Sequence, residues 1–202
     1  SNAEQKNIKE IFTGVMVVNG KILKELIPFI SNNNASKEYY LTDLIGIANS
    51  NGFKIETLSV SWEETLGANT RIEQEKLEQT YRKMKNEELL KKGITLIDKN
   101  RIDVRGELQA GVDCTLDINV IFEGKVELGN NVKIGANTII TNTKIGDNSE
   151  ILPFSHIDSS HIGKDCFIGP YARLREGSEI ADGARIGNFV ETKKAKIGQS
   201  TK

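Results

Sequence analysis

The sequence has little of the basic excess of nucleic-acid-binding proteins, and it lacks the long apolar runs of membrane-spanning proteins and the leader of secreted ones. It has 27 Lys and Arg against 28 Asp and Glu, so no basic excess attracts nucleic acid or anionic lipid. No apolar run approaches the length of a membrane span, and no charged-then-apolar leader opens it. A chain of 202 residues fits two modest domains.

Cysteine is also scarce, with only Cys114 and Cys166 in the whole chain. Both occur at a small-residue position of the repeat described below, so we expect them in the core, with a disulfide or a metal-binding pair as the alternative. Free buried thiols are typical of the cytoplasm, which is the predicted location.

The main regularity is an aliphatic residue that returns about every sixth position from Val104 onward. A period of six fits neither the helix nor a two-faced strand, and it is typical of a coil that turns a corner every six residues. We call these aliphatic positions the anchors: Val104, Ala110, Leu116, Phe122, Leu128, Ile134, Ile140, Ile145, Ile151, Ile157, Ile162, Ile168, Leu174, Ile180, Ile186 and Ile197. Small residues generally follow four positions later, as at Cys114, Val120, Thr138, Ser149, Ser155, Cys166, Ala172, Ser178, Ala184, Val190 and Thr201.

The repeat predicts a left-handed parallel β-helix of hexapeptide repeats over residues 94–202, with about five three-sided coils and inward anchors. Glycine follows many anchors, which we attribute to backbone freedom at tight corners. Two five-residue steps, before Ile145 and before Ile162, indicate shortened turns. Thr192 fills an anchor position in the last, eleven-residue gap. The repeat stops in mid-pattern, so we expect a truncated domain.

The first part of the chain has the pattern of an incomplete α/β domain. Residues 11–18 and 53–60 are β-favouring runs, and we expect both to be strands of a parallel sheet. Between them we expect a helix from about Lys21 to Pro28 and a second helix from about Glu38. Two strands and two helices do not complete an α/β layer, so the front of this domain is expected to be missing.

Residues 70–93 read as a long linker helix that separates the two domains. Thr70 and Glu73 form a predicted capping box at its start, and Gly93 is the predicted stop. Residues 1–3 have the sequence of a tag remnant, which leaves residues 4–69 for the α/β domain.

Several motifs, in order along the chain, are specific enough to suggest a family. They are NNNA with EYYLTD at 32–43, GANTR at 67–71, IDVRG at 102–106, IGPYARLR at 168–175 and IGNFVETKK at 186–194. With them the chain resembles the bacterial bifunctional N-acetylglucosamine-1-phosphate uridyltransferase/glucosamine-1-phosphate acetyltransferases. The resemblance implies that residues 4–69 are the C-terminal part of a Rossmann-like nucleotidyltransferase domain, and that the β-helix is the acetyltransferase.

The family resemblance also implies substrates, partners and site residues. Acetyl-CoA would acetylate glucosamine 1-phosphate, and UTP with Mg²⁺ would then give UDP-N-acetylglucosamine in a homotrimer, for cell-wall and lipopolysaccharide synthesis. Arg175 and Lys193 would bind the sugar phosphate, since guanidinium and ammonium groups suit phosphate oxygens. The residues implied for the uridyltransferase site are Asn69, also a Mg²⁺ ligand, with Glu38, Tyr40 and Thr42.

Several departures from the family pattern lead us to expect no activity from this sequence alone. The glycine-rich phosphate loop and the partner aspartate for Mg²⁺ do not occur, and the expected catalytic histidine would lie three residues beyond Lys202. In addition, Phe12 stands where the family usually has Asn, and a phenyl ring cannot make the amide hydrogen bond to the nucleotide-sugar.

Other functions remain open at this point. One is a different sugar-phosphate nucleotidyltransferase with a β-helix tail, and another is a non-catalytic trimeric β-helix module. His156 and His161 flank a shortened corner and are expected to be surface or corner residues. A zinc site between subunits, as in the β-helical carbonic anhydrases, would need a third inward ligand that the sequence does not offer.

Overall fold

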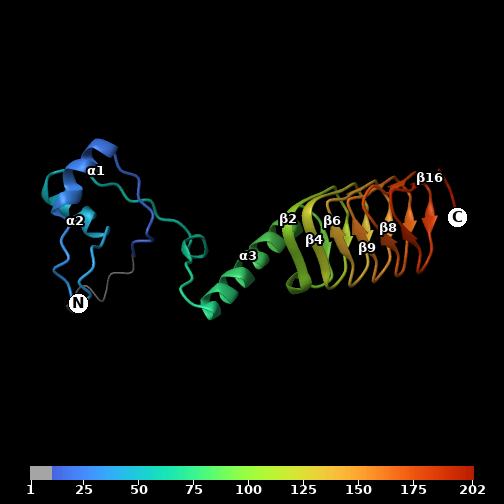
Figure 1. The fold of residues 1–202 in the computed structure, drawn as a ribbon, viewed down its shortest axis with the longest axis horizontal. Coiled ribbons are helices and arrows are strands. Elements are labelled where there is room, and N and C mark those ends of the chain that lie inside the picture. The colour runs from blue at the N-terminus through green and yellow to red at the C-terminus, as the bar shows by residue number, and fades with distance from the viewer. Residues whose placement is uncertain (1–10) are drawn as a thin grey trace. The chain divides into compact units, whose positions relative to one another are not determined.

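Figure 1 shows the fold of the chain in a computed structural model that describes residues 11–202. The chain divides into two compact units, and the second begins at Gly67. The predicted tag remnant and the start of the predicted first domain lie outside the described residues. Among residues 11–202, no helix is both long and apolar enough to cross a membrane.

The first unit contains short helices joined by irregular segments. They are α1 (Gly20–Leu26), the 3₁₀ helix η2 (Ile27–Phe29), α2 (Asp43–Ser50) and the 3₁₀ helix η3 (Trp62–Thr65). The predicted first helix is confirmed: Asn19 caps it by accepting a hydrogen bond from the Lys21 N–H at 2.9 Å, and Pro28 lies in the 3₁₀ turn that ends it.

The predicted second helix begins later than expected, at Asp43 rather than near Glu38. Asn34 explains the delay, because its side-chain amide hydrogen-bonds both the N–H and the C=O of Glu38. Those bonds hold the backbone in a turn instead of a helix. Of the expected apolar stripe only Leu44 is buried, while Leu41 and Ile45 are exposed.

The two strands predicted in the first unit are not formed, so that prediction is wrong. Residues 11–18 and 53–60 are irregular and largely exposed; Val17 and Leu58 are 101% and 88% accessible. A strand needs a neighbour to hydrogen-bond with, and neither segment has one within residues 11–202. The predicted Rossmann-like sheet is therefore not formed by the described residues.

Helix α3 (Arg71–Lys91) confirms the helix predicted for residues 70–93, and it belongs to the second compact unit. Thr70 accepts a hydrogen bond from the Glu73 N–H, and the Glu73 carboxylate accepts from the Thr70 N–H at 3.0 Å, which completes the capping box. Hydrogen bonds from the backbone N–H groups of Asn69 and Thr70 lower the pKa of Glu73. Gly93 follows the helix with a φ of +84°, a conformation that favours glycine.

The C-terminal half of α3 is more than a spacer, because it packs on the first turn of the β-helix. Asn86 is fully buried, and its Nδ2 donates hydrogen bonds to the carbonyls of Lys99 at 2.7 Å and Ile102 at 3.0 Å. Leu89 belongs to the same buried cluster as Ile94 and Ile102. These contacts cover the apolar N-terminal end of the β-helix core.

The β-helix has three faces built from parallel strands. The first face is a six-stranded sheet of β1 (Thr95–Leu96), β3 (Thr115–Leu116), β5 (Lys133–Ile134), β8 (Glu150–Ile151), β11 (Phe167–Ile168) and β14 (Arg185–Ile186). We call one turn of the chain around all three faces a rung. Six rungs are therefore present, where about five were predicted.

The second and third faces share one sheet because two long strands, β2 (Ile102–Ala110) and β4 (Val120–Leu128), bend from one face to the other. The second face continues through β6 (Ile139–Thr141), β9 (His156–Asp158), β12 (Arg173–Leu174) and β15 (Glu191–Thr192). The third face continues through β7 (Lys144–Ile145), β10 (His161–Ile162), β13 (Glu179–Ile180) and β16 (Lys196–Ile197).

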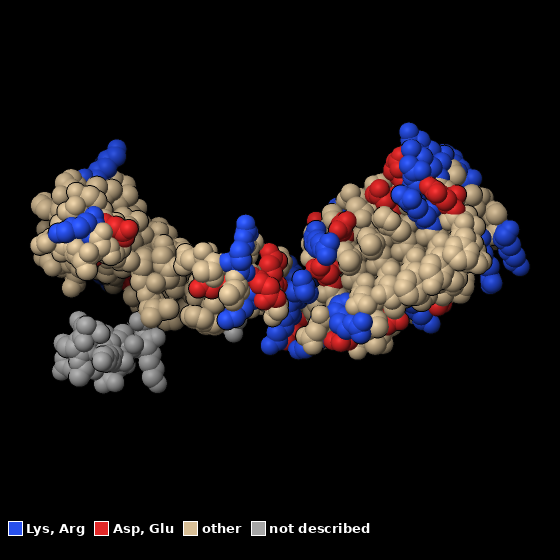
Figure 2. Space-filling view, turned by 60° about the horizontal axis from the view of Figure 1, so that its bottom comes forward, with Lys and Arg blue, Asp and Glu red and all other residues tan. Residues whose placement is uncertain are grey.

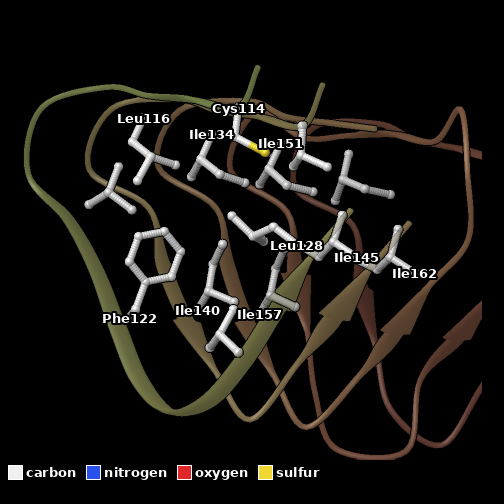
Figure 3. Close-up of a cluster of buried hydrophobic side chains, with 14 of the residues drawn as sticks. Cys114, Leu116, Phe122, Leu128, Ile134, Ile140, Ile145, Ile151, Ile157 and Ile162 are labelled. Carbon is white, nitrogen blue, oxygen red and sulfur yellow. The ribbon is translucent and has the colours of Figure 1, made fainter. Parts of the chain in front are cut away.

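The anchors point inward and stack on their equivalents in the next rung, as predicted (Figure 3). Leu116, Ile134 and Ile151 form one such column in the core. Every anchor from Leu116 to Ile186 is buried, whereas Val104, Ala110 and Ile197 at the two ends are partly buried. Burial of one such side chain contributes about 1.5–3 kcal/mol.

Most of the small positions are buried as well. Cys114 and Cys166 are buried and free, so the prediction of small core residues is confirmed for both. Burial raises the pKa of both thiols. Val190 and Thr201 are exceptions that remain exposed, because within residues 11–202 no further rung covers that end of the core.

The corners correct our explanation of the glycines. Gly135 and Gly146, which follow anchors, do not have positive φ. A Cβ at Gly146 would lie 2.6 Å from the backbone carbon of Gly163 in the next rung, so these glycines are required by close approach between rungs. Gly169, which follows the anchor Ile168, does have a positive φ of +98°, and most other positive φ values in the β-helix belong to corner residues that are often Asn or Asp, such as Asn131 and Asn148.

One corner carries stacked aromatic side chains. The rings of Phe154 and Tyr171 lie 5.0 Å apart and nearly parallel, at 5°, and Phe189 continues the stack 5.3 Å from Tyr171. All three residues have positive φ and remain exposed. The stack is an uncharged surface strip on the outside of the β-helix, which we call the aromatic corner.

Candidate functional site

The predicted phosphate-binding residues, Arg175 and Lys193, occupy equivalent positions on adjacent rungs. Strands β12 and β15 pair in register, with Leu174 opposite Thr192, and Arg175 and Lys193 each follow one of that pair. The Arg175 N–H donates to the Thr192 carbonyl at 2.9 Å. The two cations thus lie at the same edge of the second face, one rung apart.

Buried hydroxyl groups fix the backbone of Arg175. Its carbonyl accepts hydrogen bonds from Ser178 Oγ at 2.7 Å and from Ser160 Oγ at 3.2 Å. The hydroxyls of Ser178 and Thr192 lie 2.9 Å apart and join the two rungs inside the core. The shortened turn places Ser160 outside the four-residue spacing, so the repeat pattern does not reveal its role.

Each cation is paired with a carboxylate of the other rung. Arg175 Nη1 lies 2.9 Å from Glu191 Oε1, and Lys193 Nζ lies 3.2 Å from Glu176 Oε1. The ion pair with Lys193 lowers the pKa of Glu176. We call these four side chains the charged quartet. Figure 2 shows Lys and Arg mixed with Asp and Glu toward this end of the β-helix.

The charged quartet combines two cations of the kind that suits an anion with two carboxylates that are engaged in ion pairs. Its two cations offer several N–H donors to phosphate oxygens, and half-exposed side chains are free to turn toward a ligand. His156 and His161 are exposed on β9 and β10, as predicted for surface residues. Among residues 11–202, no three His, Cys, Asp or Glu are arranged to hold a metal ion.

An open groove of about 450 Å³ runs along the corner between the second and third faces. Lys125, Lys144 and His161 line it, together with Ser160 and Ser178, whose hydroxyls bind the Arg175 carbonyl. Glu127 accepts ion pairs from Lys125 at 3.3 Å and Lys144 at 3.2 Å, which lower its pKa. The groove therefore lies beside Ser160 and Ser178, the residues whose hydroxyls fix the backbone of Arg175.

The residues predicted for the uridyltransferase site are divided between the two units. Glu38, Tyr40 and Thr42 are exposed in the first unit, and Thr42 lines an open groove of about 560 Å³ against α2. Asn69 belongs to the second unit, beside the N-cap of α3. Phe12, the departure from the family pattern, is also exposed.

The described residues do not fit the predicted magnesium site. The side chain of Asn69 is exposed, and its N–H donates to Glu73 Oε2 at 2.8 Å. That carboxylate is occupied in the capping box of α3. Since Mg²⁺ needs carboxylate and phosphate oxygens beside an amide, Asn69 and its described neighbours do not hold the ion by themselves.

The segment that contains the charged quartet matches a known family. Residues 159–194 match the family model described as Bacterial transferase hexapeptide (six repeats). The matched segment includes all four residues of the charged quartet.

Solved structures of transferases also align with the chain, at low identity. One is a mutant of AntD, an N-acyltransferase from Bacillus cereus, in complex with dTDP and coenzyme A. It is 15% identical, with 55% of this chain and 79% of that chain covered and a TM-score of 0.48. Another is the acetyltransferase domain of PglB from Neisseria gonorrhoeae, 13% identical, with 55% and 63% covered and a TM-score of 0.28.

Proposed function

We propose that the β-helix belongs to an acetyl-CoA-dependent acetyltransferase whose acceptor is glucosamine 1-phosphate. In this proposal Arg175 and Lys193 bind the phosphate of the sugar. The observation that carries it is the position of these two cations on adjacent rungs, inside the segment that matches the hexapeptide transferases. The family resemblance of the sequence motifs supplies the identity of the sugar and of the acyl donor.

The proposed reaction forms an amide and releases a thiol. The amine nitrogen of the sugar attacks the thioester carbonyl carbon, a C–N bond forms, the C–S bond breaks, and the amine loses a proton to a general base. The phosphate contacts would act by orientation, since they hold the amine at a fixed distance from the bound anion. No residue of this sequence is proposed as the base, so ligand binding is the direct test of the proposal.

The resemblance extends the proposal to a uridylyltransferase partner reaction with UTP and Mg²⁺ and to a homotrimer. For the uridylyltransferase reaction, Thr42 lines the groove against α2, and we derive no step through the metal. The aromatic corner supports the homotrimer, because a stack of exposed, uncharged rings is a surface that another chain can cover. Light scattering of the purified chain would test the trimer: a monomer mass would contradict it.

Calorimetric titration with glucosamine 1-phosphate tests the proposed site. We expect measurable binding to the chain as it stands, and a loss of roughly 30-fold in affinity for Arg175→Ala, since a charge-assisted hydrogen bond contributes about 2 kcal/mol. Lys193→Ala is expected to weaken binding roughly tenfold, because an ammonium provides a single point charge. Glucosamine without phosphate should bind far more weakly to all of these proteins.

Lys196→Ala is the matched control for Lys193→Ala. Lys196 forms an ion pair with Glu179 at 3.1 Å, one face away, in the same two rungs. If the charged quartet is the binding site, Lys196→Ala keeps the affinity of the unchanged protein. No binding of the sugar phosphate, or equal losses in the two variants, would overturn the proposal and favour a β-helix that serves only as an assembly module.

A further inference from the structure

Both cations of the proposed site form ion pairs with glutamates of the same chain. Lys193 Nζ lies 3.2 Å from Glu176 Oε1, and Arg175 Nη1 lies 2.9 Å from Glu191 Oε1. Each pair joins the two rungs, since the rung of Arg175 also supplies Glu176 and the rung of Lys193 also supplies Glu191. A phosphate that binds both cations must therefore displace or share carboxylate partners.

The two glutamates hold different positions. Glu191 lies in strand β15, directly opposite Arg173 of β12. Glu176 lies outside the strands, at the corner after β12, where its backbone carbonyl accepts the N–H of Lys194 at 3.1 Å. That bond fixes the corner backbone, while the half-exposed side chain of Glu176 pairs with Lys193, and the nearby charge of Arg175 also lowers the pKa of Glu176. Its carboxylate can therefore leave without disturbing the fold.

We propose that Glu176 competes with the substrate phosphate for Lys193 and thereby sets the affinity of the site and its preference for doubly charged anions. This inference rests on the proposed function. A carboxylate carries one negative charge and a phosphate monoester close to two, so a phosphate gains more from Lys193 than the carboxylate loses. A singly charged ligand has no such advantage and does not break the ion pair between Glu176 and Lys193.

The size of the competition follows from the exposure of the pair. Ion pairs with this degree of exposure stabilise weakly, so breaking one lowers ligand affinity by a factor of roughly 1.5 to 5. Glu176 thus reduces the affinity for anions, and most of all for singly charged ones, while it leaves the two cations in place. It acts through Lys193 and is a specificity-determining residue rather than a catalytic one.

Titration of Glu176→Gln with glucosamine 1-phosphate tests the inference. The amide keeps the shape of the side chain and removes its charge, so we expect roughly 1.5- to 5-fold tighter binding than in the unchanged protein. Glu176→Asp keeps the charge and should bind nearly as weakly as the unchanged protein. In the same series, the preference for the sugar phosphate over singly charged acetate should fall in Glu176→Gln.

Glu179→Gln is the matched control. Glu179 pairs with Lys196 at 3.1 Å in the same rungs but on the third face, so its loss makes the same change in net charge. Tighter binding in Glu176→Gln alone supports the inference. Unchanged or weaker binding in Glu176→Gln, or equal tightening in Glu179→Gln, overturns the inference while the proposed function stands. If no protein in the series binds the sugar phosphate, the proposed function fails and the inference fails with it.

Discussion

The two units of this chain show what a β-favouring run needs in order to become a strand. Strand β6 in the β-helix and residues 11–18 in the first unit are both rich in β-branched residues. In β6, Ile139 pairs with Ile121 and with His156, which are 18 and 17 residues away. Residues 11–18 have no such neighbour within residues 11–202 and remain irregular.

The difference lies in where the partner comes from. In the β-helix the chain itself supplies the next strand after each turn, so backbone hydrogen bonds and the apolar core form from the same short repeat. In the first unit, local propensity alone would have to order each segment. The comparison shows that partner availability, rather than residue type, decides which runs become strands.

The largest effect should come from removing an anchor. Ile157→Ala deletes a fully buried side chain between the equivalent anchors Ile140 and Leu174, and we expect it to lower the free energy of unfolding by about 3 kcal/mol. The counterpart in the first unit is Leu58→Ala, at a position that is 88% exposed, for which we expect a change within about 0.5 kcal/mol. Urea unfolding followed by circular dichroism measures both. Similar losses would show that residues 53–60 are packed after all.

A smaller effect, with opposite signs in the two units, should come from adding a methyl group to glycine. Gly146→Ala brings a Cβ to 2.6 Å from the backbone of Gly163, and overpacking of this kind costs about 1–3 kcal/mol. Gly46 lies inside α2 with nothing within 4 Å of an added Cβ, so Gly46→Ala should stabilise that helix by up to about 1 kcal/mol. Thermal unfolding of the two variants gives the signs. If Gly146→Ala unfolds at the same temperature as the unchanged protein, the result would contradict the close approach of the rungs.

The smallest effect concerns ion pairs between rungs. Asp147 accepts the N–H of Asn130 at 2.9 Å and pairs with Lys164 at 2.9 Å, and these contacts lower its pKa. A lowered pKa contributes stability that is present above the unfolded-state pKa and is lost as the pH falls through the folded-state pKa. Asp147→Asn should therefore reduce the loss of stability below about pH 4. Urea titrations at several pH values measure this, and identical pH profiles would rule the contribution out.

Much of the β-helix could be predicted because each anchor meets an equivalent anchor. The six-residue period fixes which side chains point inward, and it placed Thr192, a polar residue, correctly in the core. The capping box of α3 was also predictable, since it is a local pattern of two side chains. Both predictions depend only on residues close in sequence or on a constant spacing.

The parts that the sequence did not reveal depend on contacts across rungs. Phe154 and Tyr171 adopt positive φ at corners, which their residue types rarely do, and stacking between rungs accompanies this conformation. The partner of Lys193 is Glu176 rather than its strand neighbour Glu191, a choice that depends on where the side chains extend over the corner. The burial of Asn86 against the first rung could not be predicted, because the charged pattern of α3 indicated an exposed helix.

The length of a rung also has a consequence for how such a site can evolve. Arg175 and Lys193 are neighbours only because 18 residues carry the chain once around the three faces. A change of one residue at a corner keeps the register, as the 17-residue spacing between Ile139 and His156 shows, whereas an inserted segment that closes another full circuit would move the lysine by one rung. A site of this kind can therefore shift along the axis of the β-helix by whole rungs while it stays on the same face.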